Sequence, residues 1–393
     1  MKTPEEVSIH KYKLAEITRH HLEESLPSRD WWLLPGISIL TIIFMLSVSE
    51  VGARAIWPAV GEDVCSNFEG VNGRFRPNCK SKVKTPVGPW IENAYNECGY
   101  RTAQSCRPKE KGNLRVAVLG TSFAYGFDVP YTSVYSTLEG QSLERKCGKH
   151  IDFQNVTAPG IDMLAVYRRT DEALALKPDV VVLAITPFDI RRDISAAQFA
   201  HRDDPPDAAL DKRKPVQGDG FLKRAFVTPV KESRAVYMLQ HFMYQDPATY
   251  LRLYMLYGDA ADFVRTSFSP EWQKHFASFD ILLAGMKKKA HAASVPMLIL
   301  IGPTVAGVAV ENTAAKPLLN ADAFTEKVSS IASKYQIPVI DPSPRFKGVP
   351  HPMSLFYAVD GHLNASGQTL VTQTLDEELL SGRYPSFAGC QAH

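Results

Sequence analysis

The chain has 393 residues, of which 45% are hydrophobic and 22% charged, and its 44 lysines and arginines nearly balance 42 aspartates and glutamates. This composition is ordinary for a globular protein and includes one long apolar run, which excludes a disordered chain, a collagen-like repeat and a polytopic membrane protein. A net charge of +2, without a basic run interleaved with aromatic residues, argues against nucleic acid as a partner.

Residues 31–49 read WWLLPGISILTIIFMLSVS and contain no charged side chain. A helix of this length covers roughly 28 Å, close to the hydrocarbon thickness of a bilayer. Trp31, Trp32 and Trp57 fall where aromatic residues favour the membrane interface. A buried core helix rarely runs so long without a charge, and a cleaved signal peptide does not fit the long polar segment before the run. We therefore expect a transmembrane helix at 31–50 that persists as an anchor.

Basic residues near the two ends of this run predict its orientation. Four precede it within twenty residues and only Arg54 follows within the same distance; the four are Lys11, Lys13, Arg19 and Arg29. Since lysine and arginine are retained on the cytoplasmic side, residues 1–30 are expected to form a cytoplasmic tail. The protein would then be a single-pass protein of a bacterial inner membrane, with everything after about residue 50 in the periplasm.

The cysteines support an extracytoplasmic location. All of them follow the apolar run, as expected in an oxidising compartment: Cys65, Cys79, Cys98, Cys106, Cys147 and Cys390. No pair has C-x-x-C spacing and no histidine cluster accompanies them, so structural disulfides are favoured over zinc. The pairing stays open, and Cys147 and Cys390 either join each other or tie down the carboxyl terminus. Residues 51–112 are interpreted as a Cys-rich membrane-proximal segment.

From Leu114 onward, short β-branched runs alternate with helical patterns. Runs typical of buried parallel strands occur at 114–120, 151–156, 179–185, 296–301 and 337–340. Helices are expected at about 133–146, 162–176, 273–293, 321–335 and 366–380. This alternation predicts an α/β fold, a doubly wound, flavodoxin-like parallel sheet of about five strands flanked by helices, with its site at the carboxyl ends of the strands.

An insertion at about 192–272 separates the third strand from the fourth. It is polar and proline-rich at first and aromatic later. Its aromatic stretches predict helices that either form a cap beside the site or only enlarge the core, and the sequence does not choose between these. The globular domain is expected at 113–385, followed by a short tail at 386–393.

The first strand runs into GTSFAYG, residues 120–126. A glycine permits a tight turn at a strand end, and Ser122 on that turn can expose its hydroxyl beside backbone N–H groups. A phosphate-binding loop is a poor alternative because no lysine follows, and a dinucleotide fingerprint lacks its further glycines.

A second motif lies near the carboxyl terminus, where VDGHLNASG places Asp360 two residues before His362. A nucleophilic serine needs a base, and the base needs a carboxylate that orients it and stabilises the imidazolium. Either motif alone is weak. A serine after the first strand together with Asp-x-His before the last helix is far more specific, because both loops reach the same edge of the sheet.

With these motifs the chain resembles the SGNH (GDSL-like) hydrolase superfamily over residues 113–385. The resemblance implies Ser122 as nucleophile, His362 as base and Asp360 as the orienting acid. It also implies an oxyanion hole made by the backbone N–H groups of Ser122 and of Gly160, the latter in NVTAPGID, which resembles the second family block. No cofactor and no metal is implied.

Two positions depart from the family pattern. Thr121 stands where aspartate usually precedes the serine, and Phe188 stands where the third block usually has an asparagine that donates to the oxyanion. A missing donor of this kind costs about 2.7–4 kcal/mol of transition-state stabilisation. Asn155 and Thr186 are candidate substitutes on the same edge. Asp189 is interpreted as a loop carboxylate that caps a helix or pairs with Arg191 or Arg192, and it stays a candidate substrate contact.

The remaining histidines have no H-x-x-x-H or similar pairing and are expected to be ordinary core or surface residues: His241, His275, His291 and His351. Only His351, close to the last block, is kept as a candidate substrate contact. The segment ENAYNECGYRT, residues 92–102, is distinctive, and we expect a disulfide-tied turn on the sheet edge.

These observations predict a membrane-anchored extracytoplasmic serine esterase. Its substrate would be an O-acetyl group on an extracellular carbohydrate or a lipid ester, an expectation that rests on location and not on any pocket residue. One alternative is an O-acetyltransferase for an envelope polysaccharide, which would need an acyl donor delivered by a multi-span partner. The other is a non-catalytic protein that binds polysaccharide or scaffolds envelope polysaccharide machinery.

Overall fold

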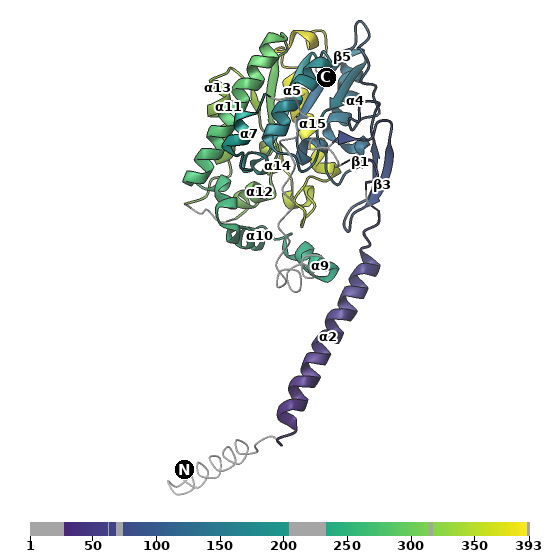
Figure 1. Cartoon of the computed structure of the whole chain (residues 1–393), viewed down its shortest axis with the longest axis vertical. Coiled ribbons are helices and arrows are strands. Elements are labelled where there is room, and N and C mark those ends of the chain that lie inside the picture. The colour runs from purple at the N-terminus through teal and green to yellow at the C-terminus, as the bar shows by residue number, and fades with distance from the viewer. Residues whose placement is uncertain (1–26, 62, 68–73, 204–232, 314–316, 391–393) are drawn as a thin grey trace, which may run out of the picture. The chain divides into compact units, whose positions relative to one another are not determined.

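A computed structural model describes residues 27–61, 63–67, 74–203, 233–313 and 317–390 (Figure 1). The chain separates into two units, with the boundary between Ile56 and Trp57. In the first unit, helix α2 (Asp30–Ile56) is long and apolar enough, by length and composition, to cross a membrane. It ends six residues later than the sequence predicts. Lys11, Lys13 and Arg19, three of the residues that predict its orientation, lie outside the described residues.

The second unit is built on a parallel sheet whose strands have the order β6-β5-β7-β8-β9. Their bounds are β5 (Leu114–Gly120), β6 (Ile151–Asn155), β7 (Val180–Ile185), β8 (Met297–Ile301) and β9 (Val339–Ile340). Every residue of β5 to β8 is buried, which explains the unbroken β-branched runs. The order is that of a flavodoxin-like sheet, so the predicted fold class is confirmed.

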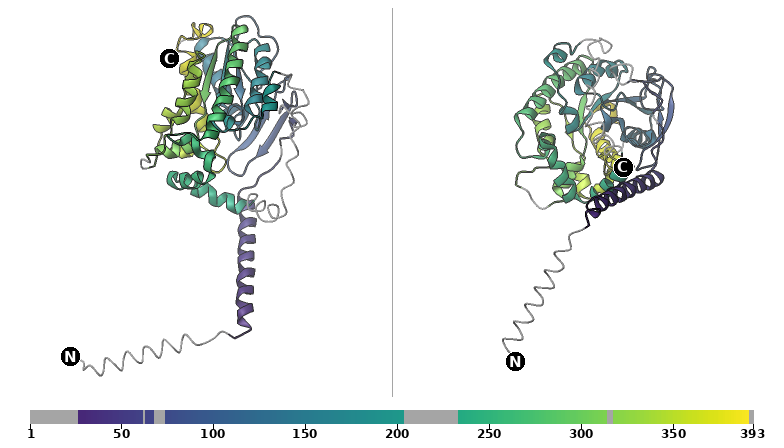
Figure 2. Two further views of the ribbon diagram at one scale, coloured as in Figure 1. Left: turned by 60° about the vertical axis from the view of Figure 1, so that its left-hand side comes forward. Right: turned by 60° about the horizontal axis from the view of Figure 1, so that its bottom comes forward.

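Helices cover both faces of this sheet (Figure 2). On one face α5 (Met163–Ala175), α11 (Pro270–Ala292) and α13 (Ala323–Ser333) pack over Ala117 and Leu119. The other face carries Val116 and Val118 and is covered by α4 (Tyr135–Cys147), α12 (Val305–Glu311), α14 (Ser343–Lys347) and α15 (Ala365–Leu379). Alternate residues of β5 thus point into two separate cores, as the two-residue period of a strand requires.

The membrane-proximal segment contains two antiparallel pairs that its weak periodicity did not predict. Strand β1 (Ser66–Asn67) pairs with β2 (Arg74–Phe75), and β3 (Lys80–Lys84) pairs with β4 (Trp90–Ala94). All six cysteines form disulfides, namely Cys65–Cys79, Cys98–Cys106 and Cys147–Cys390. The expectation of structural disulfides is confirmed, and Cys147 joins Cys390, the first of the two alternatives.

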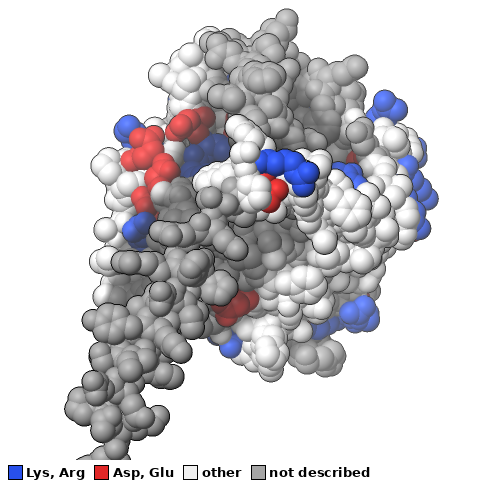
Figure 3. All heavy atoms as spheres, turned by 90° about the horizontal axis from the view of Figure 1, so that it is seen from below, with Lys and Arg blue, Asp and Glu red and all other residues white. Residues whose placement is uncertain are grey.

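The described part of the insertion is mostly helical. It contains α7 (Ala196–Ala200), α9 (Arg234–Met243), α10 (Pro247–Tyr254) and the 3-10 segment η4 (Met255–Val264), whereas residues 204–232 lie outside the described residues. Short 3-10 turns complete the unit at η1 (Tyr131–Ser133), η5 (Pro352–Leu355) and η6 (Pro385–Phe387). Seen from below, the described surface carries acidic and basic side chains on the same face (Figure 3). That face therefore does not favour a partner of one sign of charge.

Candidate active site

Ser122 begins a single helical turn, α3 (Ser122–Tyr125), directly after β5. The sharp exit from the strand depends on Gly120, whose φ is +152° and whose position leaves no room for a side chain. A Cβ there would lie 2.3 Å from the carbonyl oxygen of Ala184 and 2.6 Å from Ala124 Cβ. Because Ser122 is the first residue of the turn, its N–H has no acceptor within the helix. The turn thus presents a hydroxyl and a backbone donor at the carboxyl edge of the sheet.

Asp360 and His362 lie on the loop between η5 and α15, where Gly361 turns the chain with a φ of +85°. His362 Nε2 lies 2.8 Å from Ser122 Oγ, and His362 Nδ1 is hydrogen-bonded to Asp360 Oδ1. Since a carboxylate only accepts, Nδ1 carries the proton in the neutral imidazole and Nε2 is left to accept one from the serine hydroxyl. The structure therefore brings together the three side chains that the two motifs supply.

The surroundings of Asp360 and His362 shift the pKa values of the two side chains in opposite directions. Burial opposes ionisation of both side chains, but their mutual hydrogen bond and charges outweigh it. The pKa of His362 is raised above the usual value of a histidine, and the pKa of Asp360 is lowered below that of an aspartate. His362 is accordingly a stronger base than a free imidazole.

Asp189 is buried and joins two of the loops at the carboxyl edge of the sheet. It caps α6 (Pro187–Ile190) by accepting from the backbone N–H of Thr186 at 2.6 Å and from the Thr186 hydroxyl at 2.9 Å. Its other oxygen accepts from the hydroxyl of Thr121, the residue before Ser122. Burial raises the pKa of Asp189 although these hydrogen bonds oppose the rise. The predicted capping role is thus observed, and the described hydrogen bonds of its carboxylate go to threonines and the backbone, not to an arginine.

Asn155 and Thr186, the candidate substitutes for the oxyanion donor that Phe188 lacks, use their donor groups in other hydrogen bonds. Asn155 is buried, and its amide donates to the carbonyl oxygen of Ala124 at 3.0 Å and to Ser136 Oγ at 3.3 Å. It supports the turn after β5 and does not line the pocket described below, because both of its N–H groups are used in the core. Thr186 does line that pocket, but its hydroxyl donates to Asp189. Phe188, 44% exposed, packs edge-on against Phe263 and has no proton to donate.

Gly160 and His351 are the remaining residues of the predicted site. Gly160 lies after β6 with a φ of +79°, and Arg192, which follows α6, donates to its carbonyl oxygen. His351 is exposed in a left-handed turn before η5 and does not line the pocket, so the structure does not support it as a substrate contact. Closeness to the Asp-x-His block in sequence therefore does not bring its side chain to the pocket.

A pocket of about 310 Å³ opens beside Ser122, Asp360 and His362. One wall comes from the insertion and consists of four tyrosines: Tyr244, Tyr250, Tyr254 and Tyr257. Successive rings of this series lie 5.4, 5.6 and 5.8 Å apart. The other walls are mainly apolar and include Phe188, Val359 and Leu363. The insertion therefore lines the site, as in the cap interpretation, while Leu251 and Phe263 also enlarge the core.

His275 is less isolated than its sequence surroundings indicate. Its Nδ1 lies 3.5 Å from Asp193 Oδ1, and Glu271 lies one helical turn before it, close enough for the three side chains to share a cation. The side chain of Asp193 is 82% exposed, however, and Glu271 is ion-paired with Lys274 at 3.0 Å. None of these side chains lines the pocket, so the group is not assigned a role in the site.

No protein-family model matches the sequence, and no curated protein does. Solved structures with a similar course of the chain include the lipase/acylhydrolase from Enterococcus faecalis, at 14% identity and a TM-score of 0.38, covering 71% of this chain and 100% of that one. A psychrotrophic esterase from Pseudoalteromonas sp. matches at 12% identity and a TM-score of 0.36, covering 68% and 97% of the two chains. A two-domain esterase active on acetylated mannans matches at 14% identity and a TM-score of 0.37, covering 71% and 52%.

Other solved structures with a similar fold are described as lipolytic proteins of the G-D-S-L family and as an SGNH-hydrolase family esterase, at 12–13% identity and TM-scores of 0.30–0.35. Their identities of 12–14% and TM-scores below 0.5 carry no argument about this chain, whose fold rests on its own strand order. The chemistry that this chain can perform follows from the side chains around Ser122.

Proposed function

We propose that this chain is a serine hydrolase of the SGNH type that cleaves an ester through Ser122, His362 and Asp360. The observation that carries the proposal is the continuous hydrogen-bonded series from Ser122 Oγ to His362 Nε2 at 2.8 Å and from His362 Nδ1 to Asp360, at the wall of a pocket. A scaffold protein has no need of these three groups in contact, and a nucleophile, its base and an orienting carboxylate are what acyl transfer requires.

In the proposed reaction the Ser122 oxygen attacks the ester carbonyl carbon while its proton passes to His362 Nε2. The tetrahedral oxyanion is stabilised by the backbone N–H of Ser122 and, as we propose, by that of Gly160, while Asp360 stabilises the imidazolium. Collapse expels the alcohol, which takes the proton from His362 and leaves an acyl-serine. Water then gives its proton to His362 and attacks the acyl-serine. The bond to the Ser122 oxygen breaks as that oxygen takes the proton back from His362, which releases the acid and restores the site. No step needs a metal or a cofactor.

The pocket supports an acylated carbohydrate as substrate. Tyrosine rings pack on the apolar faces of sugar rings while their hydroxyl groups remain able to form hydrogen bonds, and four tyrosines form one wall here. An ester of a lipid is the second substrate class that an apolar, aromatic wall accommodates. If a sugar hydroxyl replaces water in the last step, the same site is an O-acetyltransferase.

The proposed location is the periplasmic side of a bacterial inner membrane, with α2 as the anchor. An N-terminal apolar helix and three disulfides within the described residues support a place outside the cytoplasm. An anchored enzyme of this kind would meet envelope polysaccharides and lipids at the membrane surface.

The test uses the purified full chain, a fluorophosphonate probe and two substrates, p-nitrophenyl acetate and an acetylated polysaccharide. We expect covalent labelling and release of acetate, and both should disappear in Ser122→Ala. Ser333→Ala, which removes an exposed hydroxyl at the end of α13, is the matched control and should react like the wild type. Labelling without hydrolysis identifies a transferase that lacks its acceptor. A folded wild-type protein that neither labels nor hydrolyses would refute the proposal and favour a binding or scaffold protein.

A further inference from the structure

Arg101 is a buried cation that contacts the turn carrying Ser122. Its side chain belongs to the ENAYNECGYRT segment, upstream of the sheet, and the residue is only 2% exposed. Its guanidinium donates to the carbonyl oxygens of Tyr125 at 2.7 Å, Gly126 at 3.1 Å and Val129 at 2.6 Å. It therefore binds three carbonyl groups of the chain that leaves α3.

The other face of this guanidinium is fixed by Asn93. Asn93 Oδ1 accepts from Arg101 Nε at 2.9 Å and from Nη2 at 2.6 Å. The Asn93 amide in turn donates to Asp63 Oδ2 and Ser81 Oγ, each at 3.2 Å. Within the described residues no carboxylate is hydrogen-bonded to Arg101. Its guanidinium contacts carbonyl and amide oxygens and lies 4.4 Å from the ring of Tyr125, and its charge also acts on the carboxylate of Asp128 in the same turn.

A second contact joins the same two segments. The hydroxyl groups of Tyr95 and Tyr125 lie 2.5 Å apart, and the Tyr95 hydroxyl donates to Asp63 Oδ2 at 2.6 Å. Phe75 stacks on both tyrosine rings. The membrane-proximal segment thus packs against α3 through its contacts with Tyr125.

The chain held by Arg101 also contacts the proposed base. The N–H groups of Gly126 and Phe127 donate to the carbonyl oxygen of Ser122 at 3.1 and 3.0 Å, and the Phe127 ring lies 5.1 Å from the His362 ring, centroid to centroid. A shift of the 125–129 turn would therefore move Ser122 and the packing of His362 together. Burying a charge is costly, and an apolar residue usually serves packing alone at least as well.

We propose that Arg101, oriented by Asn93, is a positioning residue that holds the 125–129 turn so that Ser122 and His362 keep their reactive geometry. The membrane-proximal segment is then part of the catalytic machinery, although it precedes the hydrolase-like domain. This inference rests on the proposed function, because it assigns a role in the reaction of Ser122.

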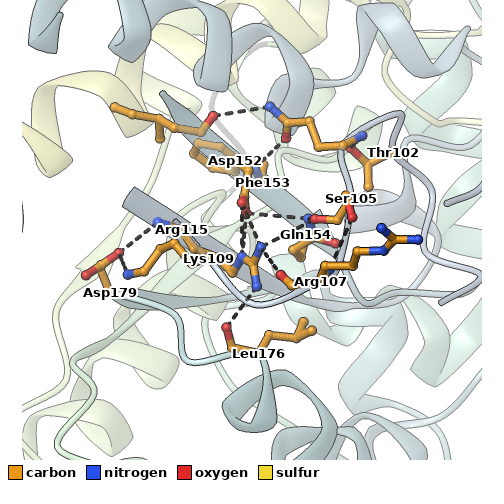
Figure 4. Close-up of polar contacts among 12 residues, drawn as sticks. Thr102, Ser105, Arg107, Lys109, Arg115, Asp152, Phe153, Gln154, Leu176 and Asp179 are labelled. Carbon is orange, nitrogen blue, oxygen red and sulfur yellow. Dashed lines mark hydrogen bonds and ion pairs between the residues drawn. The ribbon is translucent and has the colours of Figure 1, made fainter. Parts of the chain in front are cut away.

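Arg115 offers a matched control for the loss of a buried arginine. It is also 2% exposed, and its guanidinium pairs with Asp152 at 2.7 Å and donates to the carbonyl oxygens of Leu176 and Arg107 (Figure 4). It lies near the amino end of β5, whereas Ser122 follows the carboxyl end of the same strand. Arg115→Met should therefore lower stability without touching the 125–129 turn.

The experiment compares the full chain with Arg101→Met, Arg101→Lys and Arg115→Met. It measures kcat and KM for p-nitrophenyl acetate and the rate of fluorophosphonate labelling, each per folded molecule as determined from a thermal melt. We expect Arg101→Met to lower kcat and the labelling rate by at least about tenfold with KM within about twofold, because small displacements of reacting groups cost this much or more. Arg101→Lys should recover part of the loss, and Arg115→Met should keep the wild-type kcat.

Hydrogen exchange supplies a readout that does not depend on turnover. Peptides that cover 122–129 should exchange faster in Arg101→Met than in the wild type, and no such change should occur in Arg115→Met. Wild-type kcat and wild-type exchange in folded Arg101→Met would overturn the inference, as would an equal loss of kcat in Arg115→Met. A wild-type chain that does not react would instead refute the proposed function. Arg101→Lys carries the comparison if Arg101→Met does not fold.

Discussion

Replacement of Asp360 by asparagine removes the charge next to His362 while keeping the shape of the side chain. In the proposed reaction His362 becomes positively charged in the transition state, so the lost charge raises the barrier. Two unit charges about 4 Å apart attract by about 4 kcal/mol at an effective dielectric constant of about 20. At about 1.4 kcal/mol per factor of ten, this corresponds to a loss of roughly 10³-fold in kcat. The side chains of Asp360 and His362 are 28% and 26% exposed, so solvent screens part of the attraction and we expect a loss of about 10² to 10³-fold.

The same substitution should move the pH dependence. His362 accepts a proton only when it is neutral, and Asp360 raises its pKa, so the wild-type kcat/KM should rise with pH along a limb centred above about 6.5. Without the carboxylate the pKa of His362 falls, and the limb should shift to lower pH although the plateau is lower.

The assay is hydrolysis of p-nitrophenyl acetate from about pH 5 to about pH 9, a range that includes this limb. Asp171→Asn is the matched control, because Asp171 is exposed and pairs with Lys289 away from the pocket. A folded Asp360→Asn protein with the wild-type plateau and an unshifted limb would refute the assignment of Asp360 as the orienting acid.

Three further predictions concern the pocket, the Asp189 cap and the anchor. Tyr254→Ala should raise KM for an acetylated oligosaccharide about five- to thirtyfold with little change in kcat, because a ring packed on the substrate contributes about 1–2 kcal/mol of binding. Tyr254→Phe keeps the ring and removes the hydroxyl, so it separates their contributions. An unchanged KM in both variants would exclude the tyrosine wall from substrate binding. Asp189→Asn should lower the free energy of unfolding by about 1–3 kcal/mol in chemical denaturation. Thr121 and Thr186 donate to both carboxylate oxygens of Asp189, and an amide has only one acceptor oxygen. A variant as stable as the wild type would contradict this role. The full chain should stay with membranes through alkaline carbonate extraction, whereas residues 57–393 should be soluble and active. Recovery of the full chain in the soluble fraction would contradict the proposal that α2 anchors the protein.

The sheet could be predicted because each strand is a local pattern. LRVAVLG is buried on both faces, so its composition alone indicates a central parallel strand, and the structure places β5 at those residues. The two short pairs in the membrane-proximal segment could not be predicted, because KSKVK has no buried residue and its pairing with WIENA depends on the disulfide-tied fold around it.

In the candidate site, too, features set by local sequence could be predicted and features set by tertiary packing could not. Ser122 and His362 lie in short motifs at fixed ends of strands and helices, so their meeting follows from the topology. The direction of the Asn155 side chain does not follow, because it depends on packing against Ser136, which is distant in sequence. The tyrosine wall had a signal in the repeated aromatic residues of the insertion, whereas the contacts of Arg101 are tertiary and had none beyond the unusual segment that contains it.

The Cys147–Cys390 disulfide closes a covalent ring across a sequence separation of 243 residues. His362 lies inside this ring and Ser122 lies on the chain before it. A single cut by a protease anywhere between the two cysteines therefore leaves the proposed nucleophile and the proposed base in one covalent molecule. The insertion, with its polar and proline-rich beginning, falls entirely within the ring. The proposed envelope enzyme would thus keep both parts of its proposed site in one molecule after a protease cut in the segment that lines the pocket.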